Sequence, residues 1–259
     1  MSARYFNWKL AIVLVISLSV LGVGAFCLRQ WRKTDRAERG LRLGNKAYQE
    51  HRWEDATEHL GAYLAVEQKD ISALLKYADA QLKIRPTKRG NVQQAEGAYR
   101  TILRIDEGNS EAATRLTELY LGIGSFGEAE LIAGRYISIK PDSEHRRMLA
   151  LAMIGQRRFE EAATELRAIV QEHPDQVLAY ETLGQLLEQR PEDFEDEPAG
   201  LFDQAVKENP SSALAYVVRA GFLRRNEKIP EVLADLERAE RHDLSDPDVR
   251  LRLARELIT

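Results

Sequence analysis

Three glycines in the stretch LGIGSFGEAE have the spacing of a nucleotide-binding turn. Gly122, Gly124 and Gly127 match G-x-G-x-x-G, in which a tight turn lets the pyrophosphate of a dinucleotide approach the backbone. That chemistry needs a buried strand before the glycines and a helix after them, whose free N–H groups face the phosphates. The preceding residues, ATRLTELYL, have apolar side chains at helical spacing instead. The sequence therefore predicts that the three glycines lie at a turn between two helices, where Gly122 and Gly124 end a helix and permit positive φ.

The five histidines give no recognisable metal or catalytic motif. His51 and His59 are eight residues apart, which places them two turns apart along a helix, too far for one small ion. Each histidine is expected beside a turn or on an exposed helix face. There is no H-E-x-x-H, G-x-S-x-G or P-loop, and the single cysteine, Cys27, excludes an internal disulfide. The sequence predicts a protein that is not an enzyme and that holds no metal and no small-molecule cofactor.

Charge is distributed unevenly along the 259 residues. Residues 1–36 contain six basic residues and one acidic residue, whereas residues 37–259 contain nine more acidic than basic residues. An acidic body of this kind lacks the basic face of a nucleic-acid binder, so no nucleic-acid partner is expected. A hydrophobic content of 44% is enough for a sizeable folded core.

Residues 10–28, LAIVLVISLSVLGVGAFCL, are predicted to form a transmembrane helix. The run has no charge, and nineteen helical residues span about the 30 Å of a bilayer's hydrocarbon core. It follows a short tail, residues 1–9, and precedes a basic juxtamembrane segment, residues 29–36. Trp8 and Trp31 flank it, where indole rings prefer the headgroup region.

A cleaved signal peptide is the alternative for this run, because Val23-Gly24-Ala25 offers small residues to a peptidase. A lipoprotein signal fits less well, since Phe26 precedes Cys27 where a small residue is usual. The length of the run and the basic residues after it favour an uncleaved, single-pass membrane anchor. Basic residues are more numerous after the run than before it, which favours a cytoplasmic position for the C-terminal body.

The rest of the chain repeats a pattern of two helices and a break. RWEDATEHLGAYL, SFGEAELIAGRYI and RFEEAATELRAIV align on an aromatic residue followed three positions later by alanine. Each follows an apolar helical stretch and precedes a proline or polar break, with a period of 33 to 36 residues. A repeat of helix, turn and helix at this period indicates a helical solenoid.

This pattern resembles the tetratricopeptide repeat, a 34-residue helix–turn–helix unit, over residues 37–259. The Leu-Gly or Leu-Ala pair of its first helix has matches such as Leu43-Gly44 and Leu183-Gly184. The small residue at its helix crossing has four matches, at Ala56, Ala95, Ala129 and Ala162. The resemblance implies an all-α, right-handed superhelix of about six repeats plus a final helix. The second repeat carries extra residues in IRPTKRGNV, the fifth is loosened by EQRPEDFEDEPAG, and the sixth has Val232 in place of the small residue.

Members of the resembled family bind peptides or partner proteins on a concave wall formed by the first helix of each repeat. The register places candidate partner-binding residues on that wall at Asn45, Tyr48, Asp79, Arg115, Glu118, Arg147, Glu181 and Gln185. Further concave positions are Leu41, Leu75, Thr114, Leu151, Val217 and Gly221.

One subfamily binds the C-terminal carboxylate of chaperones with five polar residues. Asn45 and Arg115 match that set, but Leu41 and Glu111 stand where lysines belong, and Lys76 stands where an asparagine belongs. The loss of two cations and the gain of an acid would repel a carboxylate, so a chaperone clamp is not expected.

Three functions fit these observations. The first is a membrane-anchored scaffold that binds proteins or peptides on its concave surface. The second is a non-catalytic helical subunit, or the N-terminal part, of a larger enzyme, secretion or envelope-assembly complex. The third is a structural spacer. The last segment, DVRLRLARELIT, has the spacing of another first helix without a second, which favours a chain that continues after Thr259 over a capping helix.

Overall fold

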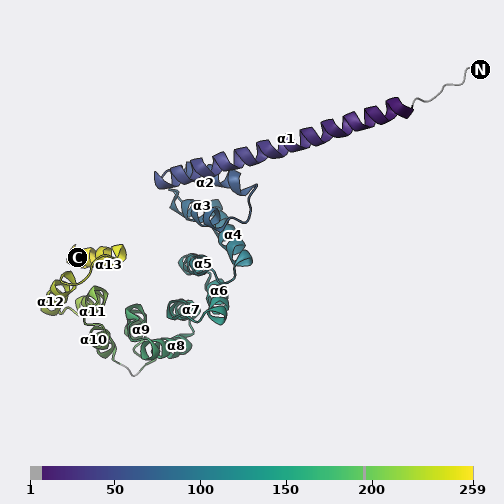
Figure 1. The fold of residues 1–259 in the computed structure, drawn as a ribbon. Helices are drawn as coiled ribbons and strands as arrows, with labels where there is room; N and C mark the ends of the chain where they lie inside the picture. Colours follow the sequence, from purple (N-terminus) through teal and green to yellow (C-terminus); the bar gives the residue numbers. More distant parts are fainter. Residues whose placement is uncertain (1–7, 195–196, 259) are drawn as a thin grey trace, which may run out of the picture. The chain divides into compact units, whose positions relative to one another are not determined.

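The structure is a computed structural model that describes residues 8–194 and 197–258, with side chains from residue 29 onward. Regular structure in this described part is entirely α-helical (Figure 1), in agreement with the predicted fold class. The helices are α1 (Trp8–Gln49), α2 (Trp53–Leu64), α3 (Ile71–Lys83), α4 (Arg89–Ile105), α5 (Ser110–Gly122), α6 (Phe126–Ile139), α7 (Ser143–Gly155), α8 (Phe159–Glu172), α9 (Val177–Gln189), α10 (Pro198–Glu208), α11 (Ala213–Arg225), α12 (Ile229–Glu240) and α13 (Pro247–Ile258).

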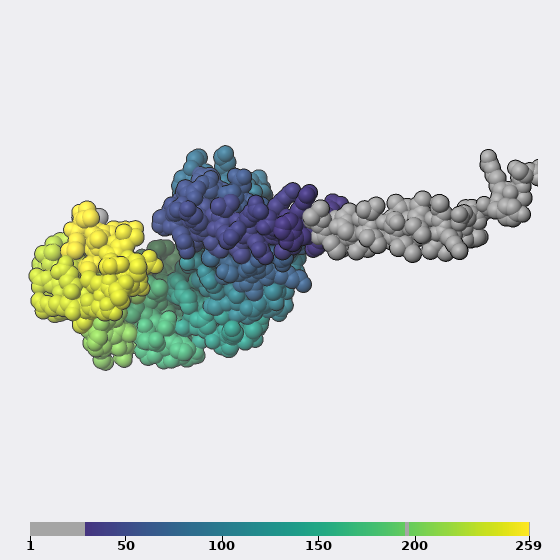
Figure 2. Space-filling view, turned by 45° about the horizontal axis from the view of Figure 1, so that its top comes forward, coloured from purple at the N-terminus to yellow at the C-terminus, as the bar shows by residue number. Residues whose placement is uncertain are grey.

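The chain divides into two compact units, residues 1–106 and residues 107–259. In the first unit, α1 packs on α2, α2 on α3, and α3 on α4, which gives two helix pairs. In the second unit, α5 to α12 form four more pairs, and α13 packs on α11 and α12. Figure 2 shows α13, in yellow, at the surface of the second unit beside the green of the preceding helices.

First helices of successive pairs also contact one another within the second unit. α5 packs on α7, α7 on α9, α9 on α11, and α11 on α13. Figure 1 shows α5, α7, α9 and α11 along the inner side of a curved row, with α6, α8, α10 and α12 along its outer side. Helix pairs stacked in this way form a solenoid, in which each pair is buried by its neighbours.

Asx and serine caps start four of the first helices. Side-chain oxygens of Asp70, Asn109, Asp142 and Ser212 accept hydrogen bonds from backbone N–H groups in the first turns of α3, α5, α7 and α11. Such a cap satisfies one of the N–H groups that a helix start leaves without an intrahelical acceptor. The polar breaks in the sequence therefore fix where four of the repeats begin.

Three-residue turns connect the two helices of four pairs, and the middle residue of each has positive φ. The φ values are 57° at His51, 74° at Gly124, 65° at Arg157 and 59° at Glu227. Longer turns follow α3 and α9, in the two stretches where the sequence carries extra residues. The left-handed conformation is thus a property of the turn position, and glycine occupies it in one pair only.

The three glycines of the G-x-G-x-x-G stretch have different positions. Gly122 is the last residue of α5, and Gly124 has the predicted positive φ. The prediction that Gly127 belongs to the turn is wrong, because α6 begins at Phe126 and Gly127 is its second residue. The segment before the glycines is helix α5, not a strand, so the context of a dinucleotide fingerprint is missing here.

Small residues lie where the two helices of a pair cross. Ala56, Ala95, Ala129 and Ala162 are all completely buried, and Val232 takes the corresponding place in the sixth pair at 1% exposure. Alanine at a crossing lets two helices approach closely, which a larger side chain would prevent. The alanine register read from the sequence is confirmed.

Helix α1 is continuous from Trp8 to Gln49. Its last turns form the first helix of the first pair, where a Cβ on Gly44 would lie 2.7 Å from Leu60 Cγ on α2. The predicted transmembrane span, residues 10–28, lies outside the residues whose side chains are described. Within the described residues, no helix is both long enough and apolar enough to cross a membrane.

Candidate partner-binding surface

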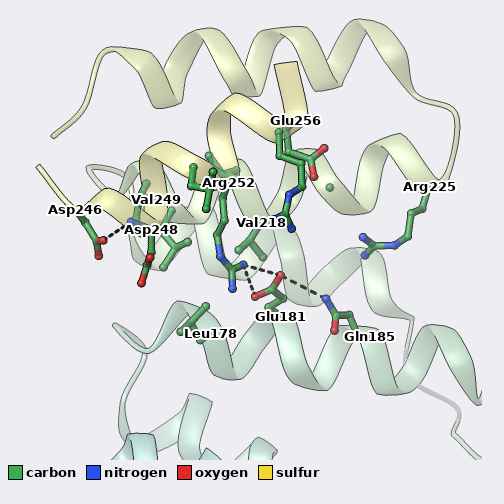
Figure 3. A pocket seen from close by; sticks show the side chains of 15 residues that line it. Leu178, Glu181, Gln185, Val218, Arg225, Asp246, Asp248, Val249, Arg252 and Glu256 are labelled. Atoms are coloured by element: carbon green, nitrogen blue, oxygen red, sulfur yellow. Dashed lines mark hydrogen bonds and ion pairs between the residues drawn. The ribbon is translucent and has the colours of Figure 1, made fainter. Parts of the chain in front are cut away.

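A cleft of about 560 Å³ opens between the first helices α9 and α11 and the final helix α13. The cleft is lined by apolar side chains, among them Leu178, Val218 and Val249, and by a similar number of charged or polar side chains, among them Glu181, Arg225 and Arg252. Figure 3 shows these side chains converging from the three helices on one space. Apolar side chains next to convergent polar groups are typical of a binding cleft.

Two of the predicted partner-binding residues, Glu181 and Gln185, line this cleft together. Gln185 Nε2 lies 3.4 Å from Glu181 Oε1, one helical turn away on α9. Arg252 Nη1 on α13 donates to both carboxylate oxygens of Glu181, at 2.8 and 3.0 Å (Figure 3). Glu181 on α9 therefore binds the guanidinium of Arg252, which lies 71 residues further along the chain on α13.

Two further ion pairs tie the walls of the cleft together. Arg224 Nε on α11 lies 2.9 Å from Glu256 Oε2 on α13. Arg225 Nη2, also on α11, lies 2.7 Å from Glu188 Oε2 on α9. The three helices of the cleft are thus joined by arginine–carboxylate pairs, whose planar, multi-donor geometry fixes orientation as well as distance.

Val217 and Gly221 were predicted as concave positions, and both line the cleft. Val217 is nevertheless only 3% exposed, because it belongs to the apolar cluster that α11 forms with Val249 and Leu253 of α13. At Val217 the concave wall is therefore covered by the final helix.

The predicted residues on α5 and α7 form pairs within their own helices. Arg115 Nη1 lies 3.1 Å from Glu118 Oε2, and both side chains are about half exposed. Arg147 Nε donates to Glu144 Oε2 at 2.9 Å, and its side chain is 16% exposed. Arg115 and Glu118 on α5 are thus the more exposed of the three side chains, and Arg147 is the most enclosed.

In the first unit, the structure brings together Asn45, Tyr48 and Asp79 on α1 and α3. Lys76 Nζ donates to Asn45 Oδ1 at 2.8 Å, and the Tyr48 hydroxyl donates to the Asp79 carboxylate. Asp79 also pairs with Lys83, at 2.8 Å between Oδ2 and Nζ. Each predicted residue of this unit therefore already has a partner on the neighbouring first helix.

Lys83 completes an aromatic site that the sequence did not predict. Its Nζ lies 4.8 Å from the ring centroid of Trp53 and 5.6 Å from that of Tyr48. The two rings meet edge to face with centroids 5.5 Å apart. A cation held over two aromatic rings gains attraction from both, which fixes Lys83 against the first turn of α2.

His145 is the main feature that the sequence analysis missed. It lies beside a turn, as expected, but its side chain is 1% exposed. Its Nδ1 contacts the Asp142 carboxylate, its Nε2 lies 3.2 Å from Thr114 Oγ1, and its ring lies 4.0 Å from the ring of Tyr136. Because Asp142 is also the cap of α7, the ring joins the cap to α5 and α6. The burial of His145 could have been predicted only from its contact with Thr114, which lies 31 residues earlier in the sequence.

Within the described residues, no group of three or more His, Cys, Asp or Glu side chains has the geometry to hold an ion.

Comparison with known proteins identifies the repeats. Residues 87–153 and residues 147–213 each match a family model described as tetratricopeptide repeat. No protein in the curated collection matches the chain. The chain thus carries tetratricopeptide repeats over its central part, as its sequence predicted.

Several solved structures have a similar fold at low sequence identity. A tetratricopeptide repeat protein from Parabacteroides merdae is 16% identical, with a TM-score of 0.57, over 85% of this chain and 84% of that one. MamA from Desulfovibrio magneticus RS-1 is 18% identical, with a TM-score of 0.55, over 68% of this chain and 97% of that one. Another MamA crystal structure is 17% identical, with a TM-score of 0.57, over 69% and 94%. Such likeness shows a helical solenoid of the tetratricopeptide type and nothing about partners.

Proposed function

We propose that this protein is a membrane-anchored, non-catalytic scaffold that binds a partner protein or peptide along its first helices. The cleft between α9, α11 and α13 is the observation that carries the proposal. It is the place where the predicted concave residues Glu181 and Gln185 line a cleft, of about 560 Å³, together with apolar side chains. Tetratricopeptide repeats in general serve protein interaction, which supports the same assignment.

The chemistry of the cleft favours a partner with basic and apolar side chains. Glu181 accepts two hydrogen bonds from the Arg252 guanidinium, so an arginine of a partner would bind the same carboxylate by replacing Arg252. Leu178 and Val218 would contact apolar side chains next to it. Arg115, Glu118 and Arg147 extend the proposed surface along α5 and α7, and Asn45, Tyr48 and Asp79 form its counterpart in the first unit.

Residues 10–28 are proposed as the anchor, with the repeats on the cytoplasmic side. The support is the charge-free run of nineteen residues and the excess of basic residues after it. Tethering to a membrane raises the effective concentration of the scaffold for a partner at the same surface.

Site-specific photo-crosslinking in cells tests the proposed surface. A photoreactive amino acid at Gln185, in the cleft, is expected to give a discrete crosslinked product of the full chain. Gln171 is the matched control, because it is an exposed glutamine on α8, a second helix. Equal crosslinking from both positions, or none from Gln185, Arg115 and Asp79, would contradict the proposal and favour a structural spacer.

A further inference from the structure

Four cations lie on one face of α1 directly after the proposed anchor. Arg29, Arg32, Lys33 and Arg36 have the spacing i, i+3, i+4 and i+7, which places them within an arc of about 100° on a helix. All four side chains are exposed. We call this set the basic face.

The acidic residues nearby do not neutralise the basic face. Asp35 lies one turn after Arg32, but its carboxylate pairs with Arg39 at 2.6 Å. Glu38 projects from the opposite side of α1. Within the described part of the chain, the four cations of the basic face make no ion pair and no side-chain hydrogen bond. Arginines in the second unit differ, since Arg146 and Arg219 each contact two or more carboxylates.

A cavity of about 660 Å³ lies between the basic face and the end of α2. The four cations line one side of it, and Ala37, Ala62 and Val66 supply an apolar side. A site with guanidinium groups on one wall and small apolar groups on the other matches a phosphate ester attached to a hydrophobic body.

We propose that this cavity binds the phosphate headgroup of an anionic phospholipid. The inference rests on the proposed function, in which residues 10–28 cross the bilayer and leave Arg29 at its surface. Guanidinium groups bind phosphate oxygens through paired, charge-assisted hydrogen bonds. Each basic residue close to an anionic membrane strengthens binding by about fivefold. The lipid would therefore hold the first helix pair against the membrane.

Nucleic acid is a poorer occupant than a lipid. A polyanion would extend beyond residues 29–36 to the rest of the chain, where acidic residues exceed basic ones by nine. The apolar wall at Ala62 and Val66 is also unnecessary for a free phosphate ion, but it suits the glycerol and acyl part of a lipid.

Native mass spectrometry of the full chain in dodecyl maltoside micelles tests the proposal. Dioctanoyl phosphatidylglycerol and dioctanoyl phosphatidylcholine share acyl chains and differ in net charge. We expect the anionic lipid to bind at least about tenfold more tightly, with the preference decreasing as salt rises from low to physiological concentration. The combined variant Arg29→Gln, Arg32→Gln, Lys33→Gln and Arg36→Gln should bind both lipids equally.

A matched control removes four exposed cations from the second unit, by Lys207→Gln, Lys228→Gln, Arg241→Gln and Arg250→Gln, and should keep the preference. Ala62→Glu is a second test that leaves the basic face intact, because it adds an acid to the exposed wall of the cavity and should reduce the preference. Circular dichroism verifies that each variant keeps its helical content.

Three results would overturn the proposal. These are equal binding of the two lipids by the parent, an unchanged preference in the four-glutamine variant, and competition by glycerol 1-phosphate at the same concentration as the lipid, which would indicate a free-phosphate site. Failure of the anchor proposal can be distinguished from failure of the lipid proposal. A carbonate wash that releases the full chain from membranes would contradict the anchor, whereas the lipid preference in micelles is measured independently of it.

Discussion

Gly124 is the one residue of the G-x-G-x-x-G stretch whose backbone conformation favours glycine. Its φ of 74° is unfavourable for an L side chain, so Gly124→Ala should lower the free energy of unfolding by about 1 kcal/mol. Gly122→Ala and Gly127→Ala are the controls, because both are helical and a Cβ at either meets no atom within 4 Å. They should be neutral or stabilising by up to about 1 kcal/mol. Urea unfolding measures all three, and a destabilised Gly127→Ala would contradict the position of the α6 start.

Predictions for single residues succeeded where the role of a residue depends on its own position in the repeat. The alanines at the helix crossings were found because four of the repeats have a small residue there, whichever residues surround it. His145 was missed because its burial depends on Thr114, Tyr136 and Asp142, which belong to two other helices and a turn. Periodicity identifies a helix face, but it does not give the identity of a partner across a helix interface.

At the scale of the elements, a buried ion pair joins α11 to α12. Arg219 donates to both carboxylate oxygens of Asp235 at 2.7 Å, and Asp235 is 1% exposed. Asp235→Ala leaves a largely enclosed guanidinium without its main acceptor, which should cost about 3 kcal/mol of unfolding free energy. Asp203→Ala is the matched control, because Asp203 contacts the same arginine at 3.0 Å but is 71% exposed, and it should cost less than about 1 kcal/mol. If thermal unfolding shows similar losses of stability for Asp235→Ala and Asp203→Ala, burial does not make the Asp235 contact the stronger of the two.

A second link between elements is sensitive to pH. Arg158, at the start of α8, donates to Glu130 on α6, and Gln156 donates to the same carboxylate. These bonds lower the pKa of Glu130 below its ordinary value of 4.5. The group is therefore ionised at a lower pH in the folded than in the unfolded chain. Its contribution to stability is complete above about pH 4.5 and is lost as the pH falls through the lower, folded-state pKa.

Glu130→Gln removes this titration, so its unfolding free energy should depend less on pH below about pH 5 than that of the parent. Urea unfolding between pH 3.5 and pH 6 provides the comparison. Glu160→Gln is a control on the exposed side of α8, and it should keep the slope of the parent. Identical slopes for the parent and Glu130→Gln would show that the contact is not formed in solution.

Element boundaries were largely predictable because the turns carry their own signals. Polar caps and prolines mark the starts of helices, and the period of 33 to 36 residues assigns each helix to a pair. The final segment was predicted to have the spacing of a first helix, and α13 packs on α11 and α12 in that manner. The bond from Arg252 to Glu181 was not predictable, since it depends on how tightly successive repeats curve.

On the scale of the whole molecule, the two ends of the chain have different electrostatic character. The basic face follows the apolar run of residues 10–28, whereas the body from residue 37 carries the acidic excess. An anionic membrane surface would attract the basic segment and repel the acidic body. This separation of charge favours a molecule held at the membrane by one end, with its first helices accessible to a partner.

The last prediction concerns the proposed membrane anchor. The full chain should remain in the pellet when membranes are washed with carbonate at high pH, because a membrane-spanning run of nineteen uncharged, mostly apolar residues would be removed only by detergent. A chain that begins at residue 29 should appear in the supernatant with its helices intact, since Ala37, Leu60 and Tyr63 still form the core of the first pair. In sealed inside-out vesicles, protease should digest the repeats if they are cytoplasmic. Release of the full chain by carbonate would contradict the anchor, and protection of the repeats in those vesicles would place them on the opposite side.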